Sequence, residues 1–131
     1  LASITTFTAA LLPVNKPRYL MGVGLPENFE TAIASGIDMF DCVAATRLAR
    51  HGNFFTSSGK KNIRNAKFQD DQGPLDGGCS CFVCDQYSAG YIRHAMVADE
   101  MVGATLLSCH NISFLFQLIE SIKAKIASGV L

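Results

Sequence analysis

Three cysteines of this chain, Cys79, Cys81 and Cys84, lie within six residues, and a histidine, His110, follows farther along. Thiolate and imidazole are ligands that Zn²⁺ prefers, and a closed tetrahedral site of three cysteines and one histidine is common in structural zinc centres. Such a site would fix the cysteine loop to the segment that carries the histidine and would contribute directly to the free energy of folding. Four protein ligands leave no position for a catalytic water. The cluster therefore predicts one structural Zn²⁺ per chain.

The cysteine cluster is also compatible with sites that differ from a Cys3His zinc centre. An iron–sulfur cluster normally needs a fourth cysteine, and Cys109 is the only candidate near the three clustered ones. Cys109 could also replace its neighbour His110 as the fourth zinc ligand; we prefer His110, but the residue chemistry leaves the choice open. Buried free cysteines would account for Cys42 and Cys109, but they fit three thiols in six residues poorly. His51 and His94 have no partner at ligand spacing and are expected to be surface or helix residues.

The cysteine count also bears on the compartment. Five cysteines, three of them too close together for a disulfide framework, indicate a reducing environment, so we expect a cytoplasmic protein. Although 49% of the residues are hydrophobic, no run approaches the roughly 20 apolar residues that a membrane-spanning helix needs, and no membrane partner is expected. The chain begins with Leu1 rather than methionine, which indicates the interior of a longer protein and a core helix over residues 1–15.

Two apolar runs with a helical segment between them predict a βαβ unit. Residues 18–24 end in two glycines, which is typical of a buried strand that opens into a loop. Pro26 suits the first turn of a helix over residues 27–35. Residues 37–43 predict a second buried strand, parallel to the first and next to it. Catalytic groups in such folds lie at the carboxyl ends of the strands, which here carry Gly22, Gly24, Asp41 and Cys42.

The second half of the chain departs from this pattern. Residues 53–64 predict a β-hairpin with a turn at residues 57–59, and a loop over residues 70–78 leads into the cysteines. Asp85 is expected to cap a following helix that Gly103 interrupts. A last amphipathic helix follows, with isoleucines and leucines at helical spacing. The sequence thus predicts an α/β fold with an inserted hairpin and metal site.

Positive charge is concentrated in one interval, although the formal net charge is +0. No acidic residue lies between Asp41 and Asp70. This interval holds six of the eleven lysines and arginines: Arg47, Arg50, Lys60, Lys61, Arg64 and Lys67. A local basic patch can bind phosphates despite a neutral total. A solvated loop and hairpin would carry the same charges, so the charge pattern alone leaves both interpretations open.

Asp41 is the second candidate for chemistry. A carboxylate on a buried strand must be paired, protonated or functional, and Arg47 or Arg50 could pair with it. A carboxylate at a strand end can instead act as a nucleophile, as in glycosyl transfer through a covalent intermediate. Asp38 lies deeper in the same predicted strand and is expected to have only a structural role.

Several motifs occur together along the chain. They are KPRYLMGVG at 16–24, GIDMFDCV at 36–43, Thr46 with Arg47, NIRNA at 62–66, PLD at 74–76, the cysteine run, and His110 with Asn111. In these motifs and their spacing, the chain resembles the tRNA-guanine transglycosylase (queuine tRNA-ribosyltransferase) family from Lys16 onwards. The NIRNA motif is closer to the bacterial branch of that family.

The resemblance implies a fold. The family fold is a (β/α)8 TIM barrel with a zinc-binding insertion near its C-terminal end. Residues 1–52 would hold the last two strands with their helices, residues 53–110 the hairpin and zinc-binding insertion, and residues 111–131 the closing helix. The N-terminal part of the barrel, which carries the family's general acid/base aspartate, is absent from the sequence. Two strands cannot close a barrel, so the chain alone is expected to be an incomplete, inactive fragment that needs that part as a partner.

The resemblance also implies an activity. The family exchanges the wobble guanine of the tRNA anticodon for a 7-deazaguanine, which is queuine or its precursor, in queuosine modification. Asp41 matches the family nucleophile, which forms a covalent bond to the ribose. Tyr19, Met21 and Gly22 match positions that bind the base.

The remaining site residues implied by the resemblance lie in the second half of the chain. Arg47 and Arg50 match residues that contact the tRNA anticodon loop. The family's zinc ligands match Cys79, Cys81, Cys84 and His110, so the resemblance selects His110 over Cys109. The implied partners are tRNA and guanine or a 7-deazaguanine, and a homodimer is typical of the bacterial family.

The chain departs from the family at Ala45, where the family usually has proline before the pair formed by Thr46 and Arg47. This change could loosen the loop that presents Arg47. Two further functions compete with the enzyme: a non-catalytic, zinc-stabilised partner subunit, and a free-standing zinc module that binds RNA. Retention of Asp41 argues against the first, and the two barrel-like strands argue against the second.

Overall fold

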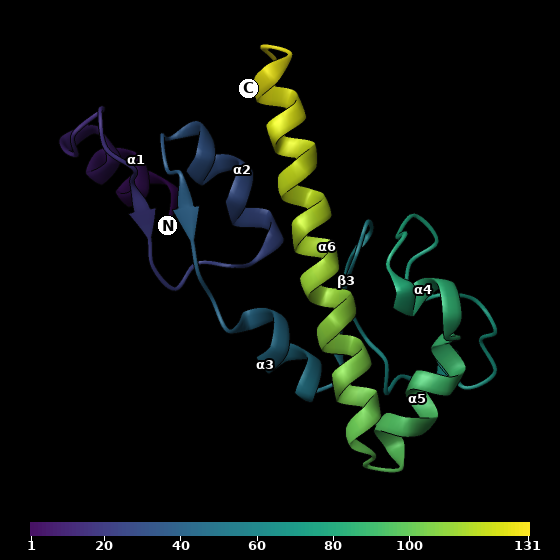
Figure 1. Ribbon diagram of the computed structural model, residues 1–131. Helices are drawn as coiled ribbons and strands as arrows, with labels where there is room; N and C mark the ends of the chain where they lie inside the picture. The colour runs from purple at the N-terminus through teal and green to yellow at the C-terminus, as the bar shows by residue number, and fades with distance from the viewer. The chain divides into compact units, whose positions relative to one another are not determined.

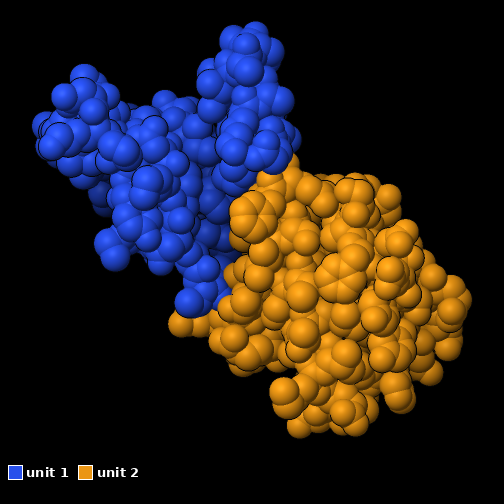
Figure 2. All heavy atoms as spheres, in the orientation of Figure 1, with its two compact units in different colours: residues 1–44, 118–131 blue, residues 45–117 orange.

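The computed structural model describes residues 1–131, which divide into two compact units (Figure 2). Unit 1 comprises residues 1–44 and 118–131, and unit 2 comprises residues 45–117. Each unit has its own cluster of buried apolar side chains, and the cluster of unit 2 is the larger.

Unit 1 contains the predicted βαβ arrangement (Figure 1). Strand β1 (Tyr19–Leu20) is followed by helix α2 (Pro26–Ala34) and strand β2 (Met39–Phe40). The strands are parallel neighbours, with Tyr19 opposite Met39 and Leu20 opposite Phe40. Pro26 occupies the first turn of α2, where its fixed φ suits the helix and its missing N–H costs nothing. The predicted order of strand, helix and parallel strand is confirmed.

The two strands are shorter and less buried than the sequence predicts. Tyr19 and Met39, which share one face of the sheet, are 46% and 47% exposed. Leu20 and Phe40 lie on the other face and pack against a small core formed by Ala9, Ala32 and Ile37. Only one face of the pair is therefore packed within unit 1.

The core helix predicted at the start of the chain forms as α1 (Ala2–Leu11), but only Thr5 and Ala9 are buried. Asp38 has the structural role that was predicted for it, since its carboxylate accepts a hydrogen bond from the Arg18 N–H at 2.8 Å. Two parallel strands with their helices constitute an α/β segment, and a closed barrel is not shown by this structure.

Unit 2 packs a β-hairpin against helices. Strands β3 (Asn53–Thr56) and β4 (Gly59–Asn62) form the predicted antiparallel hairpin. The helices are α3 (Ala44–Arg50), the 3-10 helix η1 (Ala66–Phe68), α4 (Phe82–Gln86), α5 (Ala89–Val97) and the first part of α6 (Met101–Ala127). The fully buried side chains of this core include Phe54, Ile63, Val83, Ile92 and Leu107.

Two predicted helix boundaries are wrong. Asp85 lies inside α4, and Ser88 caps α5 instead by accepting a hydrogen bond from the Tyr91 N–H at 3.1 Å. Gly103 does not interrupt a helix but lies inside α6, and the chain turns before it at Asp99, whose φ is +60°. Both Asp and Ser are good caps, so the sequence alone does not choose between two such residues three positions apart.

Helix α6 begins ten residues earlier than the closing helix predicted at residues 111–131, so His110 lies inside it. By length and composition alone it could cross a membrane, which corrects the expectation that no segment is apolar enough. Its Leu106, Leu107, His110 and Asn111 are nevertheless buried in unit 2. The fully buried polar pair, which makes specific hydrogen bonds, indicates that this part of α6 is a core helix.

Gly103 allows α6 to approach α5 closely. A Cβ atom at this position would lie 2.9 Å from the backbone nitrogen of Met96 and 2.9 Å from its Cγ. We expect Gly103→Ala to lower the free energy of unfolding by about 1–3 kcal/mol, because backbone cannot move aside cheaply. Gly77→Ala is the matched control, since a Cβ there would meet nothing within 4 Å. Urea denaturation measures both variants, and equal stability of the two would contradict this account of Gly103.

Candidate functional site

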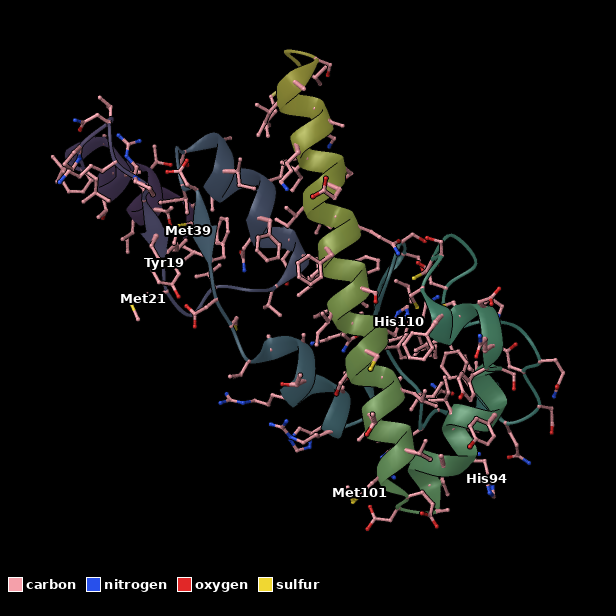
Figure 3. The ribbon with its side chains drawn as sticks, in the orientation of Figure 1. Tyr19, Met21, Met39, His94, Met101 and His110 are labelled. Carbon is pink, nitrogen blue, oxygen red and sulfur yellow. The ribbon has the colours of Figure 1, made fainter.

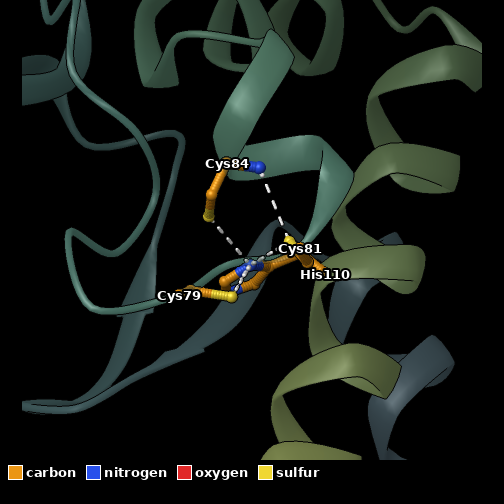
Figure 4. Close-up of side chains that lie close together, drawn as sticks. All are labelled: Cys79, Cys81, Cys84 and His110. Atoms are coloured by element: carbon orange, nitrogen blue, oxygen red, sulfur yellow. Dashed lines mark hydrogen bonds between the residues drawn. The ribbon is translucent and has the colours of Figure 1, made fainter.

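The three clustered cysteines are brought together by the first turn of α4. The Cys81 sulfur caps this helix by accepting a hydrogen bond from the Cys84 N–H at 3.5 Å, which places both thiols on one side of the turn. Cys79 is held by a backbone hydrogen bond from its N–H to the Asp76 carbonyl at 3.1 Å. The sequence spacing therefore becomes a turn that directs three sulfurs to one point (Figure 4).

Helix α6 supplies the fourth group. The Nδ1 atom of His110 lies 3.8 Å from the Cys79 sulfur, 3.6 Å from the Cys81 sulfur and 3.4 Å from the Cys84 sulfur. All four potential ligand atoms lie within 4.8 Å of one another. Figure 4 shows the sulfurs gathered around the imidazole.

These distances fit a tetrahedral zinc ion. With Zn–S bonds of about 2.3 Å, Zn–N bonds of about 2.0–2.1 Å and tetrahedral angles, a sulfur and a nitrogen ligand are separated by about 3.6 Å. The three separations from Nδ1 range from 3.4 to 3.8 Å around that value. Cys79, Cys81, Cys84 and His110 could therefore hold a metal ion.

The hydrogen bond of the second ring nitrogen of His110 determines the tautomer of the imidazole. Its Nε2 lies 2.8 Å from the carbonyl oxygen of Phe55 in β3. A carbonyl can only accept a hydrogen bond, so Nε2 carries the proton and Nδ1 presents a lone pair to the thiols. His110 is fully buried, and this hydrogen bond fixes both its orientation and its tautomer.

Burial shifts the pKa values of three groups in the cluster. It raises the pKa of the Cys84 thiol to about 12, raises the pKa of the Cys79 thiol, and lowers the pKa of His110. In each case the desolvated site disfavours the charged form. Without a cation, burial favours the neutral forms of Cys79, Cys84 and His110, and a bound cation would stabilise the thiolates. The chemistry of this donor set fits zinc.

The structure also distinguishes between the metal sites that the sequence allows. Cys109 is half-buried and is not a member of the group formed by the three cysteines and His110. The group therefore has the composition of a Cys3His zinc site rather than the four cysteines that an iron–sulfur cluster normally takes. His51 and His94 are exposed, as expected, and Figure 3 shows His94 on α5, apart from His110.

A second group of site residues lies at the carboxyl ends of β1 and β2 in unit 1. Asp41 follows β2, and its Oδ1 accepts a hydrogen bond from the Gly22 N–H at 3.0 Å. Gly22 has a φ of +74°, which an L side chain would adopt only with strain. A hydrogen bond to the Asp41 carboxylate is the main cause of the raised pKa of Tyr19. These three residues converge because parallel strands end at the same edge.

Asp41 is exposed, so its predicted burial on a strand is wrong. Strand β2 ends at Phe40, and Asp41 therefore lies on the open edge rather than inside the sheet. Met21 is 73% exposed beyond the end of β1. Figure 3 shows Tyr19, Met21 and Met39 near one another around this edge. The edge thus combines a carboxylate, an aromatic ring and a thioether that solvent can reach.

Arg47 and Arg50 lie on α3 in unit 2 and are both exposed. The opposite face of this short helix is buried through Ala45 and Ala49, one turn apart. The charged side chains also lie near the C-terminal end of the helix, where the helix dipole favours positive charge.

Sequence reasoning assigned no role to two residues that organise unit 2. Asp76 accepts hydrogen bonds from the N–H and hydroxyl of Ser57, at 2.9 and 3.0 Å, and so fastens the hairpin turn to the loop before the cysteines. Asn111 is fully buried and joins α6 to β3 and α3. Both belong to motifs that carried the resemblance, but a motif does not reveal which backbone groups a side chain will meet.

Comparison with known proteins identifies a family for the whole chain. The family model described as queuine tRNA-ribosyltransferase matches residues 1–131. The chain belongs to the queuine tRNA-ribosyltransferase family. Three relatives with that name come from Dictyoglomus turgidum, Halothermothrix orenii and Symbiobacterium thermophilum. They are 50%, 48% and 51% identical over 96%, 98% and 91% of this chain. These alignments cover 32%, 34% and 30% of the relatives, so the chain spans about a third of their length.

The metal centre of this family member can be tested by ligand substitution. We expect Cys81→Ala to reduce the zinc content from one ion per chain to a small fraction, because it removes one of the four ligands, the buried thiol of the three. Cys109→Ala is the matched control: it removes a neighbouring thiol outside the cluster and should leave one zinc per chain. Elemental analysis by mass spectrometry after dialysis measures both variants. Zinc retained by the Cys81 variant would refute Cys81 as a ligand, and zinc loss from the Cys109 variant would show that the fourth ligand is wrong.

Proposed function

We propose that this chain is the C-terminal part of a tRNA-guanine transglycosylase, in which Asp41 is the nucleophile. Family membership over the whole chain and the position of Asp41 beside Gly22 and Tyr19 at the open edge of the sheet support this proposal. The enzyme would exchange the wobble guanine of a tRNA anticodon for a 7-deazaguanine, queuine or its precursor. The observation that carries the assignment is the exposed, backbone-held carboxylate at a parallel strand end.

The chemistry proposed for Asp41 has two displacements. A carboxylate oxygen attacks C1′ of the ribose, the bond from C1′ to N9 of guanine breaks, and its electrons leave with guanine, which takes up a proton. The incoming deazaguanine nitrogen then attacks C1′, loses its proton and releases the carboxylate. The Gly22 N–H would hold Oδ1 and so orient the carboxylate for attack.

Tyr19, Met21 and Gly22 would form part of the base site. Tyr19 contributes an aromatic ring that is 46% exposed, and Met21 contributes a thioether that is 73% exposed. A flat purine-like base can stack on such groups, since aromatic and polarizable side chains favour contact with a π-face. Guanine and the 7-deazaguanine would use the same place in turn.

Arg47 and Arg50 would contact the phosphates of the tRNA anticodon loop. Both are exposed on α3, in an interval without acidic residues from residue 42 to residue 69. Positive side chains on one short helix can neutralise successive phosphates and release counterions. The zinc ion would be structural, since three sulfurs and one nitrogen complete its coordination.

The division of the chain and its surroundings are also proposals. Residues 1–52 would be the last two strands of a (β/α)8 barrel with their helices, residues 53–110 the hairpin and zinc-binding insertion, and residues 111–131 the closing helix. The face of the sheet that carries Tyr19 and Met39 would pack against the N-terminal part of the barrel, which would also supply the general acid/base. We place the enzyme in the cytoplasm, with a homodimer as its assembly.

The non-catalytic alternatives are less well supported. A partner subunit that only docks RNA has no use for an exposed carboxylate held by Gly22. A free-standing zinc module would not need a βαβ unit whose parallel strands end beside a carboxylate. The enzyme hypothesis accounts for both units of the chain.

The nucleophile can be tested in the full-length protein. We expect Asp41→Asn to abolish the covalent adduct with tRNA, because an amide does not displace a base from C1′. Asp38→Asn is the matched control: an amide oxygen can still accept the Arg18 N–H, and adduct formation should persist. Denaturing gel electrophoresis of labelled tRNA detects the adduct, and its survival in the Asp41 variant would refute the assignment.

The tRNA contact can be tested through its salt dependence. We expect Arg50→Ala to weaken binding of a tRNA anticodon stem-loop and to reduce the salt slope by about 1, as for the loss of one phosphate contact. Lys123→Ala is the control, since it removes one positive charge that is paired with Glu120 on α6. Fluorescence anisotropy over a range of salt concentrations gives both slopes. Equal slopes for wild type and the Arg50 variant would exclude Arg50 from the phosphate contacts.

A further inference from the structure

Asn111 makes three hydrogen bonds from one fully buried side chain. Its Oδ1 accepts from the Phe55 N–H at 3.0 Å, and its Nδ2 donates to the Ala45 carbonyl at 2.9 Å and to the Asn53 carbonyl at 3.1 Å. The orientation of the amide is determined by these partners, because an N–H must face the oxygen and carbonyls must face the nitrogen. Asn111 thus connects three elements of unit 2: α6, β3 and the start of α3.

The adjacent residue on α6 is His110, whose Nε2 binds the carbonyl of the same Phe55. In an antiparallel hairpin, alternate residues direct their N–H and C=O groups away from the partner strand. The Phe55 groups that bind α6 belong to this outer edge of β3. Two consecutive residues of α6 therefore satisfy both polar groups of one strand residue, and one of those two residues is a potential metal ligand.

The hydrogen bond from the Asn111 amide to the Ala45 carbonyl links α6 to α3 as well as to β3. Ala45 and Ala49 form the buried face of that helix, and their small side chains allow the close approach that a bond to a backbone carbonyl requires. Arg47 and Arg50 project from the exposed part of the same helix. A displacement of the Ala45 carbonyl by a fraction of a helical turn would therefore redirect both arginines.

We propose that Asn111 is a positioning residue that transmits the order of the metal site to helix α3 and so fixes Arg47 and Arg50 for RNA binding. This inference rests on the proposed function of the two arginines. Zinc would hold His110 in place, His110 and Asn111 would together hold β3, and the Asn111 amide would hold α3. The metal then acts on RNA affinity without touching RNA.

The side chain must be asparagine for this role. The site demands one acceptor and two donors in a short planar group, whereas an aspartate supplies no donor when ionised and only one when protonated. Asn111→Asp therefore keeps the acceptor for the Phe55 N–H but cannot make the hydrogen bonds to the Ala45 and Asn53 carbonyls together. The variant weakens the contact to α3 and keeps the bond to Phe55 of β3, the residue that also binds His110.

The experiment compares the zinc-loaded full-length protein with its Asn111→Asp variant. We expect the variant to keep one zinc per chain, because the metal ligands and the Phe55 N–H bond remain. Hydrogen exchange in residues 45–50 should become faster, while exchange in residues 89–97 of α5 stays unchanged. Ser108→Ala is the matched control on the same helix, since the Ser108 hydroxyl binds only the Ala104 carbonyl of its own helix; we expect no change in α3.

Binding of a tRNA anticodon stem-loop gives a second readout. In the Asn111→Asp background, Arg50→Ala should reduce the salt slope by much less than the value of about 1 expected in the wild-type background, because the arginine is no longer held at its phosphate. A full Arg50 effect in that background, unchanged exchange in residues 45–50, or loss of zinc from the variant would each overturn the proposal.

The two proposals fail in different ways. If Arg50→Ala has no effect on the slope in the wild-type background, the RNA contact of the proposed function is refuted. The exchange measurement needs no RNA and then still decides whether Asn111 fixes α3. If the Arg50 effect is present in wild type and persists undiminished in the Asn111 variant, the RNA contact stands and the positioning role is refuted.

Discussion

The hydrogen bond from the His110 imidazole to the Phe55 carbonyl is the constraint on which unit 2 depends. It places a polar side chain in a fully buried position, where an unsatisfied group would cost much of the stability of a small unit. The Nε2 atom donates to β3, and the Nδ1 atom faces three sulfurs. The same imidazole thus joins the hairpin, the long helix and the cysteine turn, and a metal ion at Nδ1 would lock all three.

The potential metal site and the proposed catalytic carboxylate belong to different units of the chain. The cysteine cluster has a complete donor set and lies in unit 2, whereas Asp41 lies at strand ends in unit 1. Asp41 is held by a backbone N–H, with the Tyr19 hydroxyl as a second partner. Neutral donors orient a carboxylate while leaving its negative charge less compensated than an ion pair with arginine would. In the proposed reaction, this environment would suit a nucleophile better than the arginine pairing that the sequence also allowed.

The sequence predicted those features that depend on local spacing. The cysteine run, the βαβ order and the hairpin each follow from neighbouring residues, and the structure contains all three. Features that depend on distant partners were missed or wrong. Ser88 rather than Asp85 caps α5, Gly103 serves a helix contact rather than a break, and Asp41 is exposed. The residue chemistry left the choice between Cys109 and His110 open, and the resemblance selected His110. The fold agrees, because neighbouring helix positions point about 100° apart and His110 is the one that faces the cysteines.

The pairing of His110 with Asn111 explains how a helix can set the register of a strand. An outward-facing strand residue presents both its N–H and its C=O on one edge, so two adjacent helix side chains can bind one residue. A shift of β3 by one residue would turn these groups toward β4, leave the buried imidazole without its acceptor and leave the Asn111 amide with only its bond to Ala45. A shift by two would separate the Phe55 ring from Phe114 on α6, whose centroid lies 6.0 Å away. The register is therefore fixed by polar and apolar contacts together, and the cysteines meet His110 only in that register.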